Sequence, residues 1–337
     1  MILIDAVYIN KTGGKMLLDL LIEELEKHNL KLFYLLDYRI VNNHPKISDR
    51  HKIKYLKGSL INRFVFYNKN GLKFKKILCF GNFPPPIKLK GVVYTYFQNV
   101  LLSQKKFISI KWYLKRLVFN MYAKNSDFWI VQTNSVKDLL QNYLKTEKLI
   151  FIFPFFKKFN PELLKNRNKI DPLNGINFLY ISTGEYYKNH KNLINAFIKY
   201  NKIYKSSSLT LTVSENYKEL CTMIQNCVNN GINIYNKGLI DKQLLSFEYK
   251  RADVFIFPSS FESFGLGLVE AVEFGLPVLA SDLPYVFDVI SPSSTFNPLD
   301  KNSIFKTMKD HDKYSKTSSK ITINNKLNEM INSIFIH

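Results

Sequence analysis

Residues Asp253–Ser281 read DVFIFPSSFESFGLGLVEAVEFGLPVLAS and contain one strand–loop–helix–strand unit. The run Asp253–Pro258 has the apolar and aromatic residues of a buried strand, and Pro277–Ser281 is a second such strand. Gly265–Phe274, which lies between them, has helical character. Two strands connected through one helix are typical of a parallel α/β sheet.

The same alternation of strand and helix extends through the rest of the chain. Further strands are predicted at Met1–Ile9, Leu30–Leu36, Lys76–Phe80, Val92–Phe97, Phe128–Gln132, Leu149–Phe153, Asn177–Ser182, Leu209–Val213 and Ile232–Tyr235. Further helices are predicted up to His28, after Phe97, from Asn134 or Ser135 to Leu144, at Lys191–Tyr204, Tyr217–Asn229, Asp241–Lys250 and Ile321–Phe335. The turn-rich stretch 154–175 predicts a linker. We therefore expect two doubly wound α/β domains at 1–160 and 171–310, with a C-terminal helical tail at 311–337 that packs back on the first domain.

The quoted loop and helix start carry residues suited to a charged ligand. Gly265 and Gly267 leave backbone N–H groups unblocked at a helix start, which favours an anion such as a diphosphate. Glu262 on the loop and Glu270 on the helix could accept hydrogen bonds from the paired hydroxyls of a ribose or a hexose. The glutamates on the helix, Glu270 and Glu273, could instead be solvated, and the loop pattern favours binding for Glu270 and solvation for Glu273.

Charge is distributed unevenly along the chain. The formal net charge is +21, of which residues 1–170 contribute +20 and residues 171–337 only +1. Lys46–Lys76 holds ten basic residues and one acid, and the stretch 105–117 interleaves basic with aromatic and aliphatic residues. Such a segment suits an anionic membrane surface, where each Lys contributes about 1 kcal/mol. A surface helix with a solvated Lys face explains this pattern of basic and apolar residues nearly as well. We find no nucleic-acid-binding module and expect no nucleic-acid partner.

Composition restricts the class further. Hydrophobic residues make up 46% and charged residues 22%, as in globular domains. No run of 18 apolar residues occurs and no basic segment precedes Met1–Ile4, so we expect neither a spanning helix nor a secretory signal. The three cysteines form no Cys-x-x-Cys pair and the six histidines have no metal-ligand spacing. We therefore expect a cytoplasmic protein with no metal and no disulfide framework.

Several motifs surround the two glutamates. They are Glu262-x7-Glu270 with Phe264-Gly265-Leu266 inside it, Gly275-x-Pro-Val-x-Ala-Ser281 after it, Ser182-Thr-Gly-Glu-Tyr-Tyr-Lys188 upstream, Phe296-x-Pro298-x-Asp300 downstream and, more weakly, Gly13-Gly14 and Ile130–Ser135. Together they resemble the signature of group 1 (family 4) glycosyltransferases. The resemblance implies the GT-B fold, in which two Rossmann-like domains face a central cleft.

The resemblance also implies a role for each matching residue. The residues that would bind a nucleotide-sugar donor are Gly13, Gly14, Lys188, Phe264, Gly265, Leu266 and Glu270. Among them, Lys188 would neutralise the diphosphate and Glu270 would hold the ribose. Glu262 would contact the transferred sugar as a catalytic residue. The family is retaining and metal-independent, so the resemblance implies no cofactor, and the donor is a nucleotide-sugar co-substrate.

Three positions depart from the family pattern. Ser263 stands where Gly is usual, and Thr183 stands where an Arg is usual. The first-domain histidine of the family has no clear counterpart, and Gln98 in Tyr96-Phe97-Gln98-Asn99 is the candidate that would replace it by hydrogen bonding. Lys188 could also be an ordinary surface lysine, and Gly13-Gly14 could be a turn. These departures leave the donor class open.

The leading hypothesis is a cytoplasmic glycosyltransferase at the inner face of a membrane. It would transfer a sugar from a nucleotide donor to a glycan acceptor, which we expect to be lipid-linked, in surface polysaccharide synthesis. The basic first half would then meet the acceptor and the anionic lipid surface, and the second half would bind the donor. One alternative is a nucleotide-sugar epimerase of the same fold. The other is a non-catalytic protein that binds anionic lipid or nucleic acid.

Overall fold

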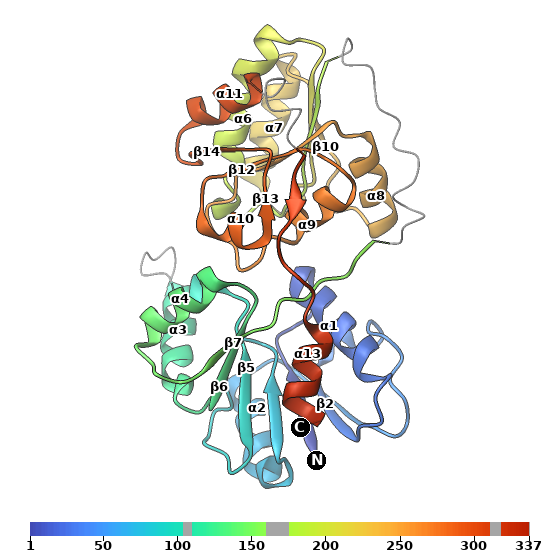
Figure 1. Cartoon of the computed structure of the whole chain (residues 1–337), viewed down its shortest axis with the longest axis vertical. Helices are drawn as coiled ribbons and strands as arrows, with labels where there is room; N and C mark the ends of the chain where they lie inside the picture. Colours follow the sequence, from blue (N-terminus) through green and yellow to red (C-terminus); the bar gives the residue numbers. More distant parts are fainter. Residues whose placement is uncertain (104–109, 160–174, 311–317, 337) are drawn as a thin grey trace. The chain divides into compact units, whose positions relative to one another are not determined.

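The computed structural model describes residues 1–103, 110–159, 175–310 and 318–336 (Figure 1). By its internal contacts the chain divides into two compact units, which are Met1–Lys157 with Asn324–His337, and Lys158–Ile323. We call them the first and the second unit and describe each by itself. The proposed linker falls largely on residues 160–174, which lie outside the described residues, as does the tail's start at 311–317.

The first unit is built on a parallel sheet of seven strands in its described residues. In spatial order the strands are β3 (Lys52–Leu56), β2 (Leu32–Asp37), β1 (Ile2–Ala6), β4 (Lys76–Cys79), β5 (Val92–Tyr96), β6 (Phe128–Val131) and β7 (Ile150–Ile152). The helices are α1 (Thr12–Leu25), α2 (Leu60–Asn70), α3 (Ile110–Ala123), α4 (Asn134–Leu144) and α13 (Leu327–Ile331), which a π-helical turn at Asn332–Ile336 extends. Single 3-10 turns lie at Tyr38–Ile40, Gly71–Lys73 and Val100–Leu102.

Both faces of this sheet are covered because its central strands are apolar on both sides. Ile4 of β1 belongs to the core that α1 forms with the C-terminal helix α13, to which Met330 belongs. Leu3, the neighbour of Ile4, points to the opposite face, where Phe66 of α2 packs. Phe119 of α3 belongs to a further cluster together with α4. Residues from the two ends of the chain therefore share one core (Figure 1).

A buried ion pair anchors α2 to the central strand. Arg63 Nε lies 2.9 Å from Asp5 Oδ2, and the two side chains are 3% and 1% exposed. The guanidinium also donates to the carbonyl oxygens of Phe83 and Pro84, each at 2.7 Å. Tyr67 donates its hydroxyl to the same carboxylate oxygen at 2.6 Å. Burial opposes the charge on Arg63, but Asp5 outweighs it and raises the pKa of the guanidinium above its ordinary value.

The second unit repeats the architecture with six parallel strands in its described residues. In spatial order they are β10 (Ile234–Asn236), β9 (Ser208–Leu211), β8 (Asn177–Tyr180), β11 (Val254–Phe257), β12 (Val278–Ser281) and β14 (Ser294–Phe296). The helices are α6 (His190–Ile203), α7 (Lys218–Asn229), α8 (Lys242–Arg251), α9 (Leu266–Glu273), α10 (Pro284–Val289) and α11 (Lys301–Lys309), with a 3-10 turn η5 at Tyr186–Lys188. Both sheets have the doubly wound strand order, so the predicted fold class is confirmed.

Several elements differ from the sequence-based prediction. The predicted helix Ile321–Phe335 is wrong in its first part, because Lys320–Ile321 forms strand β15, antiparallel to β13 (Ile290–Ser291). The helical part begins only at Leu327. The pattern also gave no sign of β3, α2, α10, β14 and α11. Helix α11 packs against α6 and buries Ile304 and Met308, so it contributes to the core of the second unit.

Candidate donor site and two cavities

A tight loop connects β11 to α9 and presents the first turn of that helix. Gly265, the N-cap of α9, has φ +84° and ψ +59°, a left-handed conformation that favours glycine. A β-carbon there would also lie 3.0 Å from Leu268 Cδ1. Phe264 is buried beside it, and α9 begins at Leu266. Gly265 has no side chain with which to cap this helix start, and the start of a helix suits an anionic ligand.

Lys188 and Glu262 form an ion pair. Lys188 closes the turn η5, and its Nζ lies 2.7 Å from Glu262 Oε1. The two side chains are 16% and 11% exposed, so this pair is much better shielded from water than an ordinary surface pair. The ammonium also lies 5.3 Å from the ring centroid of Tyr187. The structure thus brings together two residues that are 74 positions apart in the sequence.

Asn189 fixes the position of this lysine. Its φ of +62° is left-handed, a conformation that Asn tolerates better than most residues. The side-chain amide donates to the carbonyl oxygens of Pro258 at 3.1 Å and Pro298 at 2.6 Å. The Lys188 turn is therefore tied to the end of β11 and to the closing stretch near Asp300. The sequence analysis did not single out Asn189, although an Asn between a turn and a helix is a signal for this conformation.

The two glutamates of α9 have different partners. Glu270 Oε2 accepts a hydrogen bond from the Tyr249 hydroxyl at 2.8 Å, and Tyr249 is fully buried in α8. Burial, followed by the charge of Glu270, raises the pKa of Tyr249 well above its ordinary value. Glu273 Oε2 accepts from the backbone N–H of Phe159 at 3.1 Å, and burial raises the pKa of Glu273. The expectation that Glu273 is a plainly solvated carboxylate is therefore wrong.

The predicted residues of the first unit lie together at the start of α1. Gly13 and Gly14 are in its first turn, and a β-carbon on Gly14 would lie 3.5 Å from Gln98 Oε1. Gln98 Nε2 donates to the carbonyl oxygen of Phe80 at 3.0 Å. The Gln98 backbone N–H donates to Asn82 Oδ1 at 2.6 Å. These contacts hold the amide oxygen of Gln98 beside the Gly-Gly turn.

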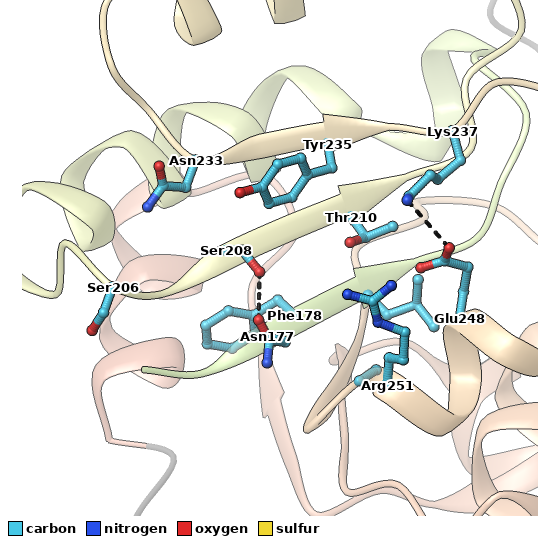
Figure 2. Close-up of a pocket in the computed structure, with 12 residues that line it drawn as sticks. Asn177, Phe178, Ser206, Ser208, Thr210, Asn233, Tyr235, Lys237, Glu248 and Arg251 are labelled. Atoms are coloured by element: carbon cyan, nitrogen blue, oxygen red, sulfur yellow. Dashed lines mark hydrogen bonds and ion pairs between the residues drawn. The ribbon is translucent and has the colours of Figure 1, made fainter. Parts of the chain in front are cut away.

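A first cavity of about 420 Å³ lies on the α8 face of the second sheet (Figure 2). Figure 2 shows short polar side chains from β8 and β9 on its floor, with Tyr235 of β10 beside them. Lys237 and Glu248 form an ion pair at its rim, 3.4 Å apart. None of the sequence-predicted donor residues lines this cavity.

A second cavity, of about 570 Å³, lies between the loop that precedes α6 and the start of α7. His190, the first residue of α6, lines it and is 3% exposed. Within the described residues, no group of three or more His, Cys, Asp or Glu side chains could hold a metal ion. The metal-independent reaction that the resemblance implies remains a prediction.

His190 predicts a pH dependence of stability. Burial, followed by the nearby Lys188 ammonium, lowers the pKa of His190 from 6.5 to about 3. Below pH 6.5 the imidazole of His190 is therefore protonated in the unfolded chain but stays neutral in the folded chain. The stability that the neutral His190 contributes is lost as the pH falls below 6.5. We expect protonation of His190 in the unfolded chain to lower the free energy of unfolding by about 1.4 kcal/mol for each unit that the pH falls between about pH 6 and pH 4. Urea unfolding of the wild type and His190→Phe across this range should show a shallower slope for the variant; parallel slopes would contradict the assignment.

Solved structures similar to this chain define its class. Sucrose-phosphate synthase from Thermosynechococcus elongatus has a TM-score of 0.74 at 15% identity, covering 99% of this chain and 94% of its own. HepE from Anabaena, solved in complex with UDP and glucose, has a TM-score of 0.68 at 14% identity, covering 99% and 95%. The lipopolysaccharide outer core galactosyltransferase WaaB has a TM-score of 0.64 at 13% identity, covering 99% and 98%. The chain has the GT-B fold of these glycosyltransferases.

Comparison of sequences identifies the family to which this chain belongs. The model described as "Glycosyl transferases group 1" matches residues 162–333, and the chain belongs to this family, as its motifs predicted. An uncharacterized 41.2 kDa protein of the cps region of Klebsiella pneumoniae is 25% identical over 256 residues, which are 74% of this chain and 64% of the relative. The GtfA subunit of a UDP-N-acetylglucosamine–peptide N-acetylglucosaminyltransferase of Streptococcus agalactiae is 29% identical over 155 residues, 46% of this chain. The chain thus spans 64% and 29% of the length of these two relatives.

Proposed function

We propose that this chain is a retaining, metal-independent glycosyltransferase. It moves a sugar, of the hexose type, from a nucleotide-sugar donor to a glycan acceptor in surface polysaccharide synthesis, and that acceptor is lipid-linked. Membership of the group 1 family supports the transfer of sugar, and the cps region of one relative supports the polysaccharide context. The UDP and glucose bound to HepE support a nucleotide-sugar donor.

The observation that carries the proposal is the arrangement around α9 in the second unit. A helix start at a glycine, a shielded cation and two carboxylates lie on α9 and on the segments that follow the neighbouring strands β8 and β11. The helix start and Lys188 match a diphosphate, because both favour negative charge and can stabilise the departing nucleoside diphosphate. Glu262 and Glu270 match the hydroxyls of the transferred sugar and the ribose. A purely structural ion pair would explain Lys188 and Glu262 but not the helix start at a glycine three residues after Glu262.

Each residue then has one task in the reaction. When the donor binds, the ion pair of Lys188 with Glu262 breaks and Lys188 binds the diphosphate. The carboxylate of Glu262 then becomes available to the transferred sugar. Tyr249 orients the carboxylate of Glu270 toward the ribose through the hydrogen bond described above. In the first unit, Gly13 and Gly14 allow close approach of backbone to phosphate. Gln98 is the proposed hydrogen-bonding residue at the reacting sugar, held by Phe80 and Asn82.

A donor screen tests this function directly. The purified chain is incubated with a panel of nucleotide sugars, with and without lipid-linked glycan extracts, and the release of nucleoside diphosphate is measured. Release that requires both donor and acceptor supports a transferase. Conversion of the donor without any acceptor supports the epimerase alternative. Calorimetry that detects no nucleoside diphosphate binding supports the non-catalytic alternative.

An exposed apolar stripe on α3 supports a membrane partner at the inner face of the cytoplasmic membrane. The exposed side chains are Ile110, Tyr113, Leu114, Leu117 and Met121, which follow helical spacing, while only Phe119 of the helix is fully buried among its described side chains. Basic residues flank the stripe. An apolar stripe with flanking cations is the pattern of a helix that lies in a membrane interface. None of the helices in the described ranges has both the length and the apolar character to cross a membrane.

Helix α2 adds a second exposed apolar surface in the same unit. Leu60, Ile61, Phe64 and Val65 are exposed on it, in the segment where basic residues are concentrated. Phe83 connects the two helices, because its carbonyl oxygen accepts from Arg63 of α2 and its ring contacts Phe119 of α3 at 6.2 Å between centroids. Apolar patches of this extent on one layer are unusual for a surface exposed only to water.

Substitution of the α3 stripe predicts weaker membrane binding. We expect Leu114→Asp combined with Leu117→Asp to lower binding to vesicles containing anionic lipid by about tenfold or more, because two apolar side chains no longer enter the membrane and two added negative charges are repelled by the anionic lipid. Leu299→Asp, at a leucine of the second unit that is more exposed than either, is the control and should bind as the wild type does. Co-sedimentation at rising salt measures both. Binding that is indifferent to lipid charge, or equal in the three proteins, would refute the membrane proposal.

A further inference from the structure

The second cavity, between the α6 and α7 starts, is a separate site from the one proposed for the donor. Its walls come from residues 184–186 and 189–191 after β8 and from 216–220 at the start of α7, and Lys188 does not line it. Neither Glu262 nor Glu270 lines it, and it shares no lining residue with the cavity of Figure 2. It lies beyond the carboxyl ends of β8 and β9, the edge where parallel sheets bind ligands.

Unpartnered polar atoms are concentrated in the wall of this cavity. Seven buried side-chain nitrogen and oxygen atoms lack a hydrogen-bond partner in the described residues, and three of them are Glu185 Oε2 and the two ring nitrogens of His190. The other oxygen of Glu185 accepts from the Tyr217 hydroxyl at 2.6 Å. Buried polar atoms without partners are unfavourable and rare in native proteins. Their concentration here indicates a place where a ligand supplies the missing partners.

The chemistry of the wall selects among ligands. His190 is neutral at physiological pH, because its pKa lies at about 3, so its ring provides one donor and one acceptor. Glu185 provides acceptors. The charged lining residues are two acids, Glu185 and Glu219, and two bases, Lys191 and Lys218, so the cavity has no excess of either sign. Such a wall favours hydroxyl groups, which both donate and accept, over an anion such as phosphate.

An aromatic side chain completes the lining. Tyr186 is 58% exposed in the cavity wall and rests edge-on against Tyr187, with ring centroids 5.5 Å apart. A tyrosine face next to a few polar groups gives an apolar contact surface with polar atoms at its border. This combination fits the apolar face and the hydroxyl edge of a pyranose ring, for which the volume of about 570 Å³ is sufficient.

We propose that this cavity binds a neutral sugar ring of a glycan, with Tyr186 against the ring face and Glu185 and His190 paired with its hydroxyls after the lining side chains rotate. The site itself rests on the cavity, whereas the choice of a glycan as its source rests on the proposed function. Binding here requires no donor and no turnover, so the two proposals can fail independently.

Saturation-transfer NMR tests the site with defined probes. The full chain is mixed with the methyl glycosides of glucose, galactose and N-acetylglucosamine, without donor, and affinities in the millimolar range are measured by titration. The variants are Tyr186→Ala, whose side chain is exposed, and Glu185→Gln, which keeps an acceptor for Tyr217. Tyr235→Ala is the matched control, because Tyr235 is 55% exposed and lines the cavity of Figure 2.

We expect at least one glycoside to bind the wild type, and both Tyr186→Ala and Glu185→Gln to weaken it by about five- to tenfold. Tyr235→Ala should bind as the wild type does. The proposal is overturned if no glycoside binds, if both variants retain wild-type affinity, or if inorganic phosphate displaces the glycoside. Loss of binding in Tyr235→Ala alone would assign the sugar to the other cavity. Glycoside binding without nucleoside diphosphate release in the donor screen would overturn the proposed function and leave this site standing.

Discussion

Glu270→Gln is expected to lower sugar transfer by about a hundredfold or more, measured as kcat/KM for the donor found in the screen. The amide oxygen of glutamine can still accept the Tyr249 hydrogen bond, so the fold around α8 and α9 is retained. The variant loses the negative charge, and with it one of the strong acceptors for the ribose hydroxyls. The effect should appear first in donor affinity, because the ribose is held in the ground state as well as in the transition state.

Glu273→Gln is the control for this experiment, since it lies on the same helix and has the same change in charge. Its amide oxygen can still accept from the Phe159 backbone N–H, and the side chain has no proposed role in the reaction. We expect its kcat/KM to stay within about twofold of the wild type. Equal losses in both variants would show a general effect on α9, and wild-type activity of Glu270→Gln would refute the proposed site.

Arg63→Met is expected to destabilise the first unit by about 3–5 kcal/mol. The substitution leaves the Asp5 carboxylate buried with only the Tyr67 hydroxyl and the Val7 N–H as partners. It also leaves the carbonyl oxygens of Phe83 and Pro84 without their donor. An unpaired buried charge costs much more than the loss of an exposed ion pair.

Tryptophan fluorescence measures this effect in the first unit alone, because both tryptophans, Trp112 and Trp129, belong to it. The double variant Asp5→Asn/Arg63→Met removes the uncompensated charge and should recover part of the loss. Lys27→Met, which breaks the exposed pair with Glu24, should cost under about 1 kcal/mol. An Arg63→Met protein within about 1 kcal/mol of the wild type would show that the buried pair does not hold α2 in place.

The fold could be predicted largely because the apolar strands are clear in the sequence. The helix predicted to end near Leu144 does end there, although Thr133 is its N-cap in place of Asn134 or Ser135. Strand β3 could not be predicted, because Lys52, Lys54 and their neighbours form an exposed edge strand with no apolar run. Edge strands with lysines are common because they resist pairing with other chains, and this same property hides them in the sequence.

The motif of the candidate site could be recognised in the sequence, but the hydrogen bonds of its side chains could not. The carboxylates and the helix start could be predicted because one continuous stretch, from Glu262 to Glu270, contains them. Tyr249 and Asn189 could not be inferred, because their hydrogen bonds join residues that only the fold brings together. The distinction between Glu270 and Glu273 likewise depends on which side chain reaches Tyr249 and which reaches the Phe159 backbone.

The shared core of α1 and α13 has a practical consequence for expressing parts of this protein. The chain leaves the first unit at Lys157 and returns at Asn324, so the second unit is an insertion in its covalent order. A fragment ending at Lys157 would lack Leu327, Met330 and Ile331, so the apolar side of α1 would be exposed to water. We expect such a fragment to aggregate, because exposed apolar surface associates with other molecules. The inserted segment can be excised as one continuous piece, whereas an intact first unit requires its two pieces to be fused.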